Sequence, residues 1–289
     1  MTIPPKYTFP RYLSSKKSVD DRALNQQVWQ MMADGLNEQV GDPVRILEIG
    51  AGIGTMVERM WTHGLLHNAS YTAIDSQPDN IIAAQQRLKS IAAQMPLQLE
   101  AIDLFEFVER EKGKRQWDLL IAHAFLDLMD VPATLPKLFS LLKPNGRFYF
   151  TINFDGGTIL QPTINATFDA QIEAIYHRTM DERITDGKQS GDSQSGRHLF
   201  QDLQNAGATV LAAGSSDWVV FAGENGYEAD EAYFLHFIVH TMQQALQRRP
   251  ELDQPQFAHW IAERHAQIER GELVYIAHQL DFYGKTLSL

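Results

Sequence analysis

The stretch Val44-Arg-Ile-Leu-Glu-Ile-Gly-Ala-Gly-Ile-Gly54 decides the fold of this chain. Its apolar first half predicts a buried strand, its glycines predict a tight turn, and residues 56–66 have the apolar spacing of a helix. Because glycine has no Cβ, the main chain of such a turn can approach a ligand closely. The first turn of the helix adds free N–H groups. The dinucleotide fingerprint G-x-G-x-x-G is incomplete, because Thr55 stands where its third glycine would be.

Strand and helix patterns alternate after this turn. The segments 78–95 and 135–142 have helical spacing, and they stand between short apolar segments typical of strands. These strand-like segments are 70–75, 97–102, 117–122 and 147–154. Alternation of this kind, with short connections, predicts a parallel sheet that is covered by helices on both faces.

The two ends of the chain are less regular. A helix is expected over 24–36, and Asp20 or Asp21 could cap it. Residues 187–196 form a polar, glycine-rich run, which is either a hinge or lid or a plain surface loop. The remaining segments are helices expected over 168–180, 197–206, 228–248 and 256–270, and strands over 208–221, with a break at 214–216, and over 273–283.

The composition limits the classes of protein to which the chain can belong. Of its 289 residues, 44% are hydrophobic and 21% are charged, as in a folded globular protein. The net charge of −11 argues against nucleic acid as a partner, since phosphate backbones attract basic surfaces. The chain has no cysteine, which excludes disulfides and thiolate metal sites. With no apolar leader and no run long enough to span a membrane, we expect a cytoplasmic protein without a membrane partner.

Two carboxylates follow the glycine turn at the ends of predicted strands. Asp75 ends the second strand, where a carboxylate can accept hydrogen bonds from both ribose hydroxyls. Asp103 ends the third strand, where a carboxylate can accept from the amine of adenine. Either one, taken alone, could also be a helix N-cap or a turn residue. A dinucleotide enzyme has a use for the first carboxylate and no evident use for the second.

With these features together, the first 155 residues resemble class I S-adenosylmethionine-dependent methyltransferases of the small-molecule type. The turn Leu-Lys-Pro-Asn-Gly at 142–146 is similar to the family's turn before its fifth strand, with Asn145 in place of a glycine. The other matching segments are 46–54, 73–75, 100–103, 117–124 and 138–150. The resemblance implies an α/β, doubly wound, seven-stranded and mostly parallel sheet with an antiparallel last strand. It also implies S-adenosylmethionine as cofactor and S-adenosylhomocysteine as product.

The resemblance also assigns the cofactor-binding residues. Glu48 would face the methionine amine, Asp75 would hold the ribose, and Asp103 with the backbone of Leu104 would hold adenine. The other residues that it places at the cofactor are Gly50, Gly52, Gly54, Ala122 and His123.

The remaining parts of the chain are expected over the cofactor. We divide the chain into an N-terminal cap segment, 1–41, and a methyltransferase domain, 42–289. Helical insertions at about 155–196 and 227–270 leave the sheet at the C-terminal edge of its strands, where ligands bind in open α/β sheets. Three segments then converge over one mouth, which predicts an enclosed pocket for a small molecule.

Residues near this edge are candidates for catalysis and for acceptor binding. His123 follows the fourth strand and is a candidate general base, and His198 is a second one. Each is otherwise a packing residue or, for His123, a cofactor contact. Candidates for substrate binding are Tyr149, Asn153, Asp217 and Trp218. Tyr12, Lys16 and Arg22 could reach the carboxylate of the cofactor if the cap folds over it.

The sequence therefore predicts methyl transfer from S-adenosylmethionine to an oxygen, nitrogen or carbon atom of a small molecule. No metal is expected, because His236 and His240 lack the glutamate of an H-E-x-x-H motif. A monomer or a homodimer is expected. The alternatives are an NAD(P)-dependent oxidoreductase and a non-catalytic S-adenosylmethionine-binding protein.

Overall fold

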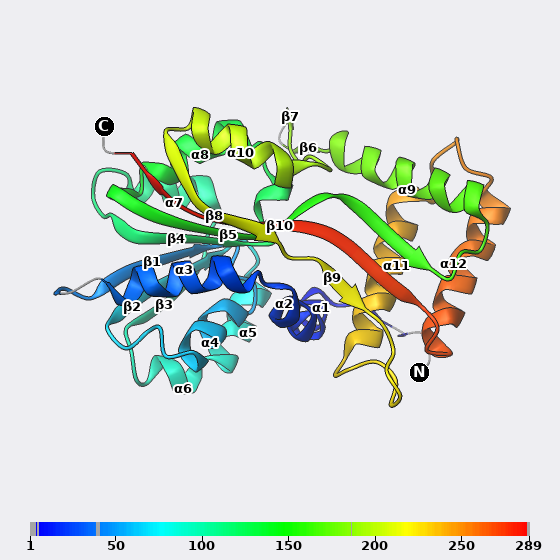
Figure 1. Ribbon diagram of the computed structural model, residues 1–289, viewed down its shortest axis with the longest axis horizontal. Helices are drawn as coiled ribbons and strands as arrows, with labels where there is room; N and C mark the ends of the chain where they lie inside the picture. The colour runs from blue at the N-terminus through cyan, green and yellow to red at the C-terminus, as the bar shows by residue number, and fades with distance from the viewer. Residues whose placement is uncertain (1–3, 5, 39–40, 186, 288–289) are drawn as a thin grey trace.

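A large mixed β-sheet runs through the computed structural model, which describes residues 4, 6–38, 41–185 and 187–287 (Figure 1). The strand order is β3-β2-β1-β4-β5-β10-β8. β1 to β5 are parallel, whereas β10 runs antiparallel to both β5 and β8. The strands on this path are β1 (Val44–Ile49), β2 (Ala69–Asp75), β3 (Leu97–Ala101), β4 (Trp117–His123), β5 (Leu142–Gln161), β8 (Ala208–Ser215) and β10 (Val274–Thr286). The predicted doubly wound, mostly parallel sheet is confirmed.

The sheet has eight strands, where seven were expected. The segment 208–221, expected as a strand with a break at 214–216, forms β8 and a separate β9 (Trp218–Val220), and both pair with β10. Between them the N–H of Ser216 still donates to the carbonyl of Gln279 at 2.9 Å. The chain therefore turns between β8 and β9 but stays hydrogen-bonded to β10.

Helices cover both faces of the sheet, and each face has its own apolar core (Figure 1). Because side chains alternate along a strand, Ile46 of β1 joins one core and Leu47 joins the other. On one face lie α3 (Gln26–Asn37), α4 (Thr55–Thr62), α5 (Pro78–Arg87) and α6 (Lys89–Ala92). On the other lie α7 (Leu104–Glu111), α8 (Val131–Phe139) and α10 (Ser195–Asn205).

The N-terminal cap contains two short helices before α3, namely α1 (Phe9–Ser15) and α2 (Lys17–Ala23). The side chain of Asn25 caps α3 by accepting from the N–H of Val28, so the expected capping role of Asp20 and Asp21 is wrong. Both aspartates lie inside α2, and Asp20 is fully buried. α1 contacts α5 and α11, and α2 contacts β9.

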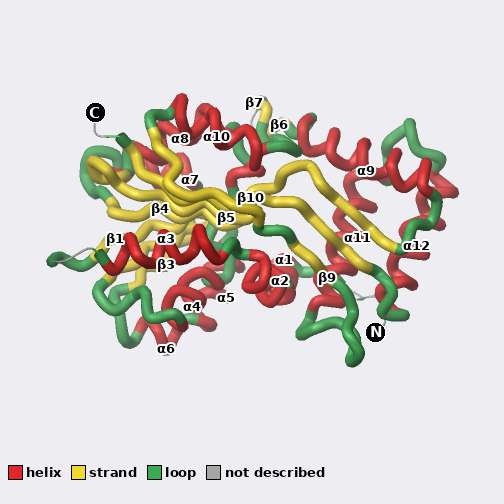
Figure 2. Tube along the Cα trace, viewed as in Figure 1, coloured by secondary structure: helices red, strands yellow, loops and turns green. Residues whose placement is uncertain are grey.

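β5 and β10 extend well beyond the parallel part of the sheet (Figure 2). The fifth strand was expected to end at 154, but its pairing with β10 continues to Gln161, which lies opposite Val274. β9 adds a third strand to this extension. Three helices lie around it: α9 (Ala166–Asp181), α11 (Glu231–Leu246) and α12 (Gln254–Glu269). We call the extension and these helices together the arm. A small hairpin of β6 (Ile184–Thr185) and β7 (Lys188–Gln189) follows α9. The segments expected as insertions thus contribute to the arm, whereas α10 lies against the sheet.

Within the described part of the chain, no helix combines the length and the apolar character needed to cross a membrane. The boundaries of the cap and of the two insertions stay predictions, because they depend on how the chain is divided into units.

Candidate active site

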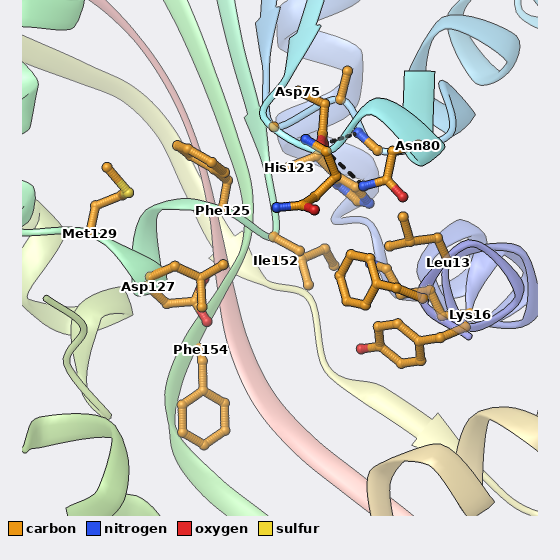
Figure 3. A pocket seen from close by; sticks show the side chains of 18 of the residues that line it. Leu13, Lys16, Asp75, Asn80, His123, Phe125, Asp127, Met129, Ile152 and Phe154 are labelled. Carbon is orange, nitrogen blue, oxygen red and sulfur yellow. Dashed lines mark hydrogen bonds between the residues drawn. The ribbon is translucent and has the colours of Figure 1, made fainter. Parts of the chain in front are cut away.

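A cavity of about 560 Å³ lies at the carboxyl ends of β1, β2 and β4, between the sheet and the arm. Figure 3 shows Asp75 and Asn80 at one end, Leu13 and Lys16 of the cap on one side, and Met129 and Asp127 on the opposite side. The cavity therefore has a part bounded by the glycine turn and a part bounded by the arm. We call them the cofactor part and the acceptor part.

The glycine turn after β1 requires glycine at the positions that face the cavity. Gly50 and Gly52 have φ angles of 62° and 55°, which residues with a Cβ rarely adopt. A Cβ on Gly50 would lie 2.2 Å from Cδ2 of Phe125. Gly54, by contrast, does not line the cavity; a Cβ there would lie 2.5 Å from Cδ1 of Leu88. Its role in this structure is to let α4 approach the end of α5.

Asp75 ends β2 and holds the glycine turn in place. Its Oδ2 accepts from the N–H of Gly52 at 2.8 Å. Its Oδ1 accepts from the N–H of Gln77 at 2.8 Å and from Nδ2 of Asn80 at 3.1 Å. Each carboxylate oxygen has two lone pairs, so Oδ2 can accept a further hydrogen bond from a ligand hydroxyl.

Two more carboxylates, those of Glu48 and Asp103, lie in the cofactor part and have hydrogen-bond partners within the protein. Glu48 is 1% exposed and accepts from the hydroxyl of Tyr71 at 2.9 Å. Burial raises the pKa of Glu48 to about 8, although the Tyr71 hydrogen bond opposes the rise. Asp103 is the N-cap of α7, since its Oδ1 accepts from two main-chain N–H groups, and it also lines the cavity beside Leu104. The capping role and the cofactor role of Asp103 are therefore compatible.

A buried hydrogen-bond network connects the cap to the ends of β4 and β9. Asp20 is at its centre: Oδ2 accepts from Nζ of Lys16 at 2.7 Å and contacts Nε2 of His123 at 3.0 Å. Oδ1 of Asp20 accepts from Nε1 of Trp218 at 2.9 Å. Nδ1 of His123 lies 2.8 Å from Oγ1 of Thr151. Lys16, His123 and Trp218 all line the cavity, so this network forms part of its wall.

The charge states in this network determine the tautomer of His123. Burial would raise the pKa of Asp20, but Lys16 and His123 outweigh it and hold the pKa well below its usual range. Burial lowers the pKa of His123 to about 4 against the opposing effect of Asp20. An ionised carboxylate only accepts, so Nε2 of the neutral ring donates to Asp20 and Nδ1 accepts from Thr151. The one basic lone pair of His123 is therefore occupied by a hydroxyl.

The acceptor part is lined mainly by aromatic side chains. They come from the cap, from the loop after β4, from β5, β9 and β10, and from the helices of the arm. Eight aromatic residues line the cavity as a whole: Phe9, Tyr12, Phe125, Phe154, Tyr176, Trp218, Phe237 and Tyr275. The ring of Tyr12 stacks on that of Phe237, with 4.1 Å between the ring centroids, and this contact joins α1 to α11 over the cavity. Asp127 and Arg183 add charged groups to this wall.

The tips of β4 and β5 have strained main chains. Ala124 and Ile152 have φ angles of 50° and 58°, and positive values are exceptional for a β-branched residue. Buried Asp281 stabilises this conformation, because its two oxygens accept at 2.8 Å from the N–H of Ile152 and from the N–H of Asn25. The side chain of Ile152 lines the cavity as a result.

Several residues that were expected at the site lie outside the cavity. Tyr149 is fully buried in the core under α3, with its ring edge-on to Trp29. Asn153 donates from Nδ2 to the carbonyl of Leu280 at 2.8 Å. Ala122 is enclosed in the other core. Strand alternation directs these side chains away from the cavity, and β5 is irregular beside them, with a positive φ at Ile152.

The two remaining candidates lie at the surface near the arm. Asp217 accepts from Ser215 at 2.6 Å and contacts His278 at 2.8 Å, so it closes the turn between β8 and β9. His198 is half-exposed on α10 and pairs with Asp192, which itself lines the cavity. Of the four predicted substrate residues, only Trp218 lines the cavity.

Of the three cap residues expected near the cofactor, two line the cavity and one binds the arm. Tyr12 and Lys16 line the cavity, as expected for residues that reach the cofactor. Arg22 instead binds Glu231 at the start of α11, with Nη1 to Oε1 at 2.6 Å. Ser18 donates to the same carboxylate at 2.7 Å. The cap is thus attached to the arm and to the sheet at once.

Sequence reasoning missed Asp20, Asp127 and Arg183. Asp20 was interpreted as a helix cap, and nothing in the local sequence indicates that it is buried against residues 103 and 198 positions away. Asp127 follows the fourth strand by four positions, so its closeness to the sheet edge could have been noticed.

Comparison with known proteins assigns the core of the fold. The model of a protein family described as a methyltransferase domain matches residues 47–148. That segment contains the glycine turn, Asp75, Asp103 and His123. That segment is similar to the methyltransferase domain family. The match extends from β1 to the middle of β5, while the cap and the arm lie outside it.

One solved structure supports the fold, and a second has a slightly lower TM-score. An S-adenosylmethionine-dependent methyltransferase from Thiobacillus denitrificans, in complex with S-adenosylhomocysteine, is 15% identical with a TM-score of 0.50, covering 99% of this chain and 100% of its own. One from Geobacter sulfurreducens, also with S-adenosylhomocysteine, is 14% identical with a TM-score of 0.49, covering 97% and 100%. No curated protein matches the chain.

The residues around the methyltransferase turn fit S-adenosylmethionine. The cradle at Gly50 and Gly52 excludes any Cβ, and Asp75 and Asp103 present carboxylate oxygens beside it. The match to a methyltransferase domain does not support the alternative of a nicotinamide-dependent oxidoreductase. Among the described residues, no cluster of three or more side chains could hold a metal ion.

Proposed function

We propose that this protein transfers the methyl group of S-adenosylmethionine to a small molecule held in the acceptor part of the cavity. The observation that carries the proposal is the continuity of one 560 Å³ cavity from Asp75 at the glycine turn to Tyr176 and Tyr275 of the arm. A macromolecular acceptor fits poorly, because the cap and the arm cover this mouth and the net charge is −11.

The described side chains suggest how the two ligands are held. Asp75 and the main chain of the turn would bind the ribose and the methionine part, and Asp103 with Leu104 would bind adenine. When bound, S-adenosylmethionine supplies a methyl group on a positively charged sulfur, ready for in-line displacement. The aromatic wall excludes water and orients the acceptor, which is the main requirement for such a transfer.

His123 stays a candidate catalytic residue, and its hydrogen bonds suggest how it would act. Its Nε2 donates to Asp20 and its Nδ1 accepts from Thr151, so the ring holds both groups at the cavity wall. We therefore favour a positioning role over proton abstraction for His123. His198 lies on the outer side of Asp192 and would act only through that residue.

Calorimetric titration with S-adenosylhomocysteine tests the proposal, with NADH as the parallel control. We expect 1:1 binding of the first compound and none of the second. Transfer of labelled methyl groups to a panel of small acceptors then separates an enzyme from a non-catalytic cofactor-binding protein. Binding of NADH alone would overturn the proposal. A cytoplasmic location, and a monomer or a homodimer as the assembled state, stay predictions.

A further inference from the structure

Two side chains of opposite charge in the acceptor part have buried atoms without partners. Asp127 lies in the short 3-10 helix η1 (Leu126–Leu128), and Arg183 lies between α9 and β6. Oδ1 of Asp127 and Nη1 of Arg183 are buried, and neither forms a hydrogen bond with any described residue. A buried polar group without a partner is destabilising, and such groups are rare unless they have a functional reason.

The two groups are neighbours on the same wall. A Cβ built on Gly191 would lie 3.1 Å from Nη1 of Arg183 and 3.2 Å from the main-chain oxygen of Asp127. Both residues line the cavity, yet no ion pair joins their side chains in the part of the chain that the structure describes. Figure 3 shows Asp127 between Phe125 and Phe154, facing the cap across the cavity.

The other charged groups of the acceptor part already have partners. Lys16 pairs with Asp20 at 2.7 Å, and Asp192 pairs with His198. The rest of this wall consists of apolar and aromatic side chains and of the uncharged polar side chains of Thr158, Thr241 and Gln279. Asp127 and Arg183 are therefore the groups that remain to recognise a charged ligand.

We propose that the methyl acceptor is a zwitterionic amine, with a carboxylate that pairs with Arg183, an ammonium group that pairs with Asp127, and an apolar body among the aromatic rings. A simple anion at Arg183 would be repelled by Asp127, and a simple cation at Asp127 would be repelled by Arg183. A molecule with both charges satisfies both groups. The planar guanidinium suits a carboxylate, and the surrounding rings suit an ammonium group. This inference rests on the proposed function.

The same arrangement provides a proton acceptor. An ammonium nitrogen has no lone pair and must lose a proton before it can be methylated. Oδ1 of Asp127 takes that proton: the N–H bond breaks, an O–H bond forms on the carboxylate, and the amine keeps the electron pair. Burial raises the pKa of Asp127 against the opposing effect of Arg183, which favours this transfer.

The test uses matched ligands that differ only in their charged groups. The first set is phenylalanine, phenethylamine and 3-phenylpropionate, and the second is alanine, ethylamine and propionate. Each is titrated by calorimetry into the full-length protein saturated with S-adenosylhomocysteine. We expect the zwitterion of at least one set to bind at least tenfold more tightly than its amine and its acid. Equal or tighter binding of the acid or the amine would overturn the proposal, as would no binding by any member.

Variants connect the preference to the two residues. Arg183→Met is expected to reduce zwitterion binding to the level of the amine, and Asp127→Asn to the level of the acid, while Arg183→Lys retains part of the preference. Arg178→Met is the control, because this exposed arginine of α9 pairs with Glu251 outside the cavity. A preference that survives in both test variants would contradict the proposal.

S-adenosylhomocysteine affinity is measured on every protein, which detects misfolded variants and separates the two hypotheses. If the wild-type protein does not bind S-adenosylhomocysteine, the proposed function fails. If it binds this compound but does not prefer a zwitterion, only the assignment of the acceptor fails.

Discussion

Oδ2 of Asp20 and Nε2 of His123 lie 3.0 Å apart, although the residues are 103 positions apart in the chain. Asp20 belongs to the cap and His123 ends β4, so this contact joins a covering segment to the cofactor-binding edge of the sheet. Lys16 and Trp218 bind the same carboxylate. A buried hydrogen-bond network around the charged Asp20 therefore holds the cap over the cavity. Such directional bonds define the position of the cap more closely than apolar contacts would.

Replacing Asp20 tests this network. Asp20→Asn leaves the ammonium group of Lys16 buried without its counter-charge, so we expect a loss of about 3–5 kcal/mol in the free energy of unfolding. The double variant Lys16→Met/Asp20→Asn removes both charges and should recover about 1–3 kcal/mol of that loss. Urea denaturation of the wild-type protein, Lys16→Met, Asp20→Asn and the double variant measures the coupling. Additive effects would show that the pair does not act as a unit.

Asp75→Ala tests the ribose assignment. The substitution removes the acceptor of the Gly52 N–H and the acceptor proposed for the ribose hydroxyls. We expect S-adenosylhomocysteine to bind about 10–100-fold more weakly, as for lost hydrogen bonds to a charged group. Asp79→Ala, on the exposed side of α5, is the matched control. Unchanged affinity in Asp75→Ala would remove the assignment.

Gly50→Ala separates crowding at the turn from backbone strain. Gly50 and Gly113 have φ angles of 62° and 73°, but a Cβ on Gly113 would meet nothing within 4 Å. Gly113→Ala should cost about 1–2 kcal/mol in unfolding free energy, from strain alone. Gly50→Ala should lower the unfolding free energy by more than Gly113→Ala does. It should also weaken S-adenosylhomocysteine binding, because the new methyl group displaces Phe125. Equal losses in both variants would show that Phe125 moves freely.

His123→Ala addresses the role of this histidine. We expect a lower kcat and an S-adenosylhomocysteine affinity within about threefold of wild type. Because burial holds the pKa of His123 near 4, kcat of the wild-type protein should show no His123-dependent change near pH 6.5. A pH–rate profile of both proteins measures this. A step near pH 6.5 that disappears in the variant would instead identify His123 as the general base. A collapse of cofactor affinity would make it a cofactor contact.

The arm contains a pair of buried histidines that should make the protein sensitive to acid. Nδ1 of His236 and Nδ1 of His265 lie 2.8 Å apart between α11 and α12. Burial lowers the pKa of His236 to about 4 and also lowers that of His265. The unfolded chain then binds more protons than the folded one between about pH 6.5 and 4. Stability is therefore full above pH 6.5 and lost as the pH falls.

We expect the unfolding free energy to drop by about 1–3 kcal/mol between pH 7.5 and 4.5 because of this pair. Urea denaturation at several pH values measures the drop. His236→Gln should reduce it, and His259→Gln, an exposed position on α12, should leave it unchanged. The same pH dependence of the unfolding free energy in all three proteins would refute this explanation.

Much of the sheet could be predicted from local patterns. The alternation of apolar and helical segments is a property of each segment, so β1 to β5 and the glycine turn follow from short windows of sequence. The length of β5 did not follow, because a long antiparallel ribbon depends on its partner β10, more than a hundred positions later. The break between β8 and β9, by contrast, could be predicted from the local run 214–216.

The candidate site also contains residues that local sequence predicts and residues that only long-range packing brings to it. The glycine turn and the carboxylates at strand ends could be predicted from short stretches of sequence, because positive φ favours glycine and parallel strands end at one edge of the sheet. The opposite part of the cavity depends on the fold: Asp127 and Arg183 enter its wall, Asp20 lies buried behind it, and Tyr149 and Asn153 point away. Those positions depend on packing between the cap, the arm and the sheet, and such long-range contacts leave no periodic signal in the sequence.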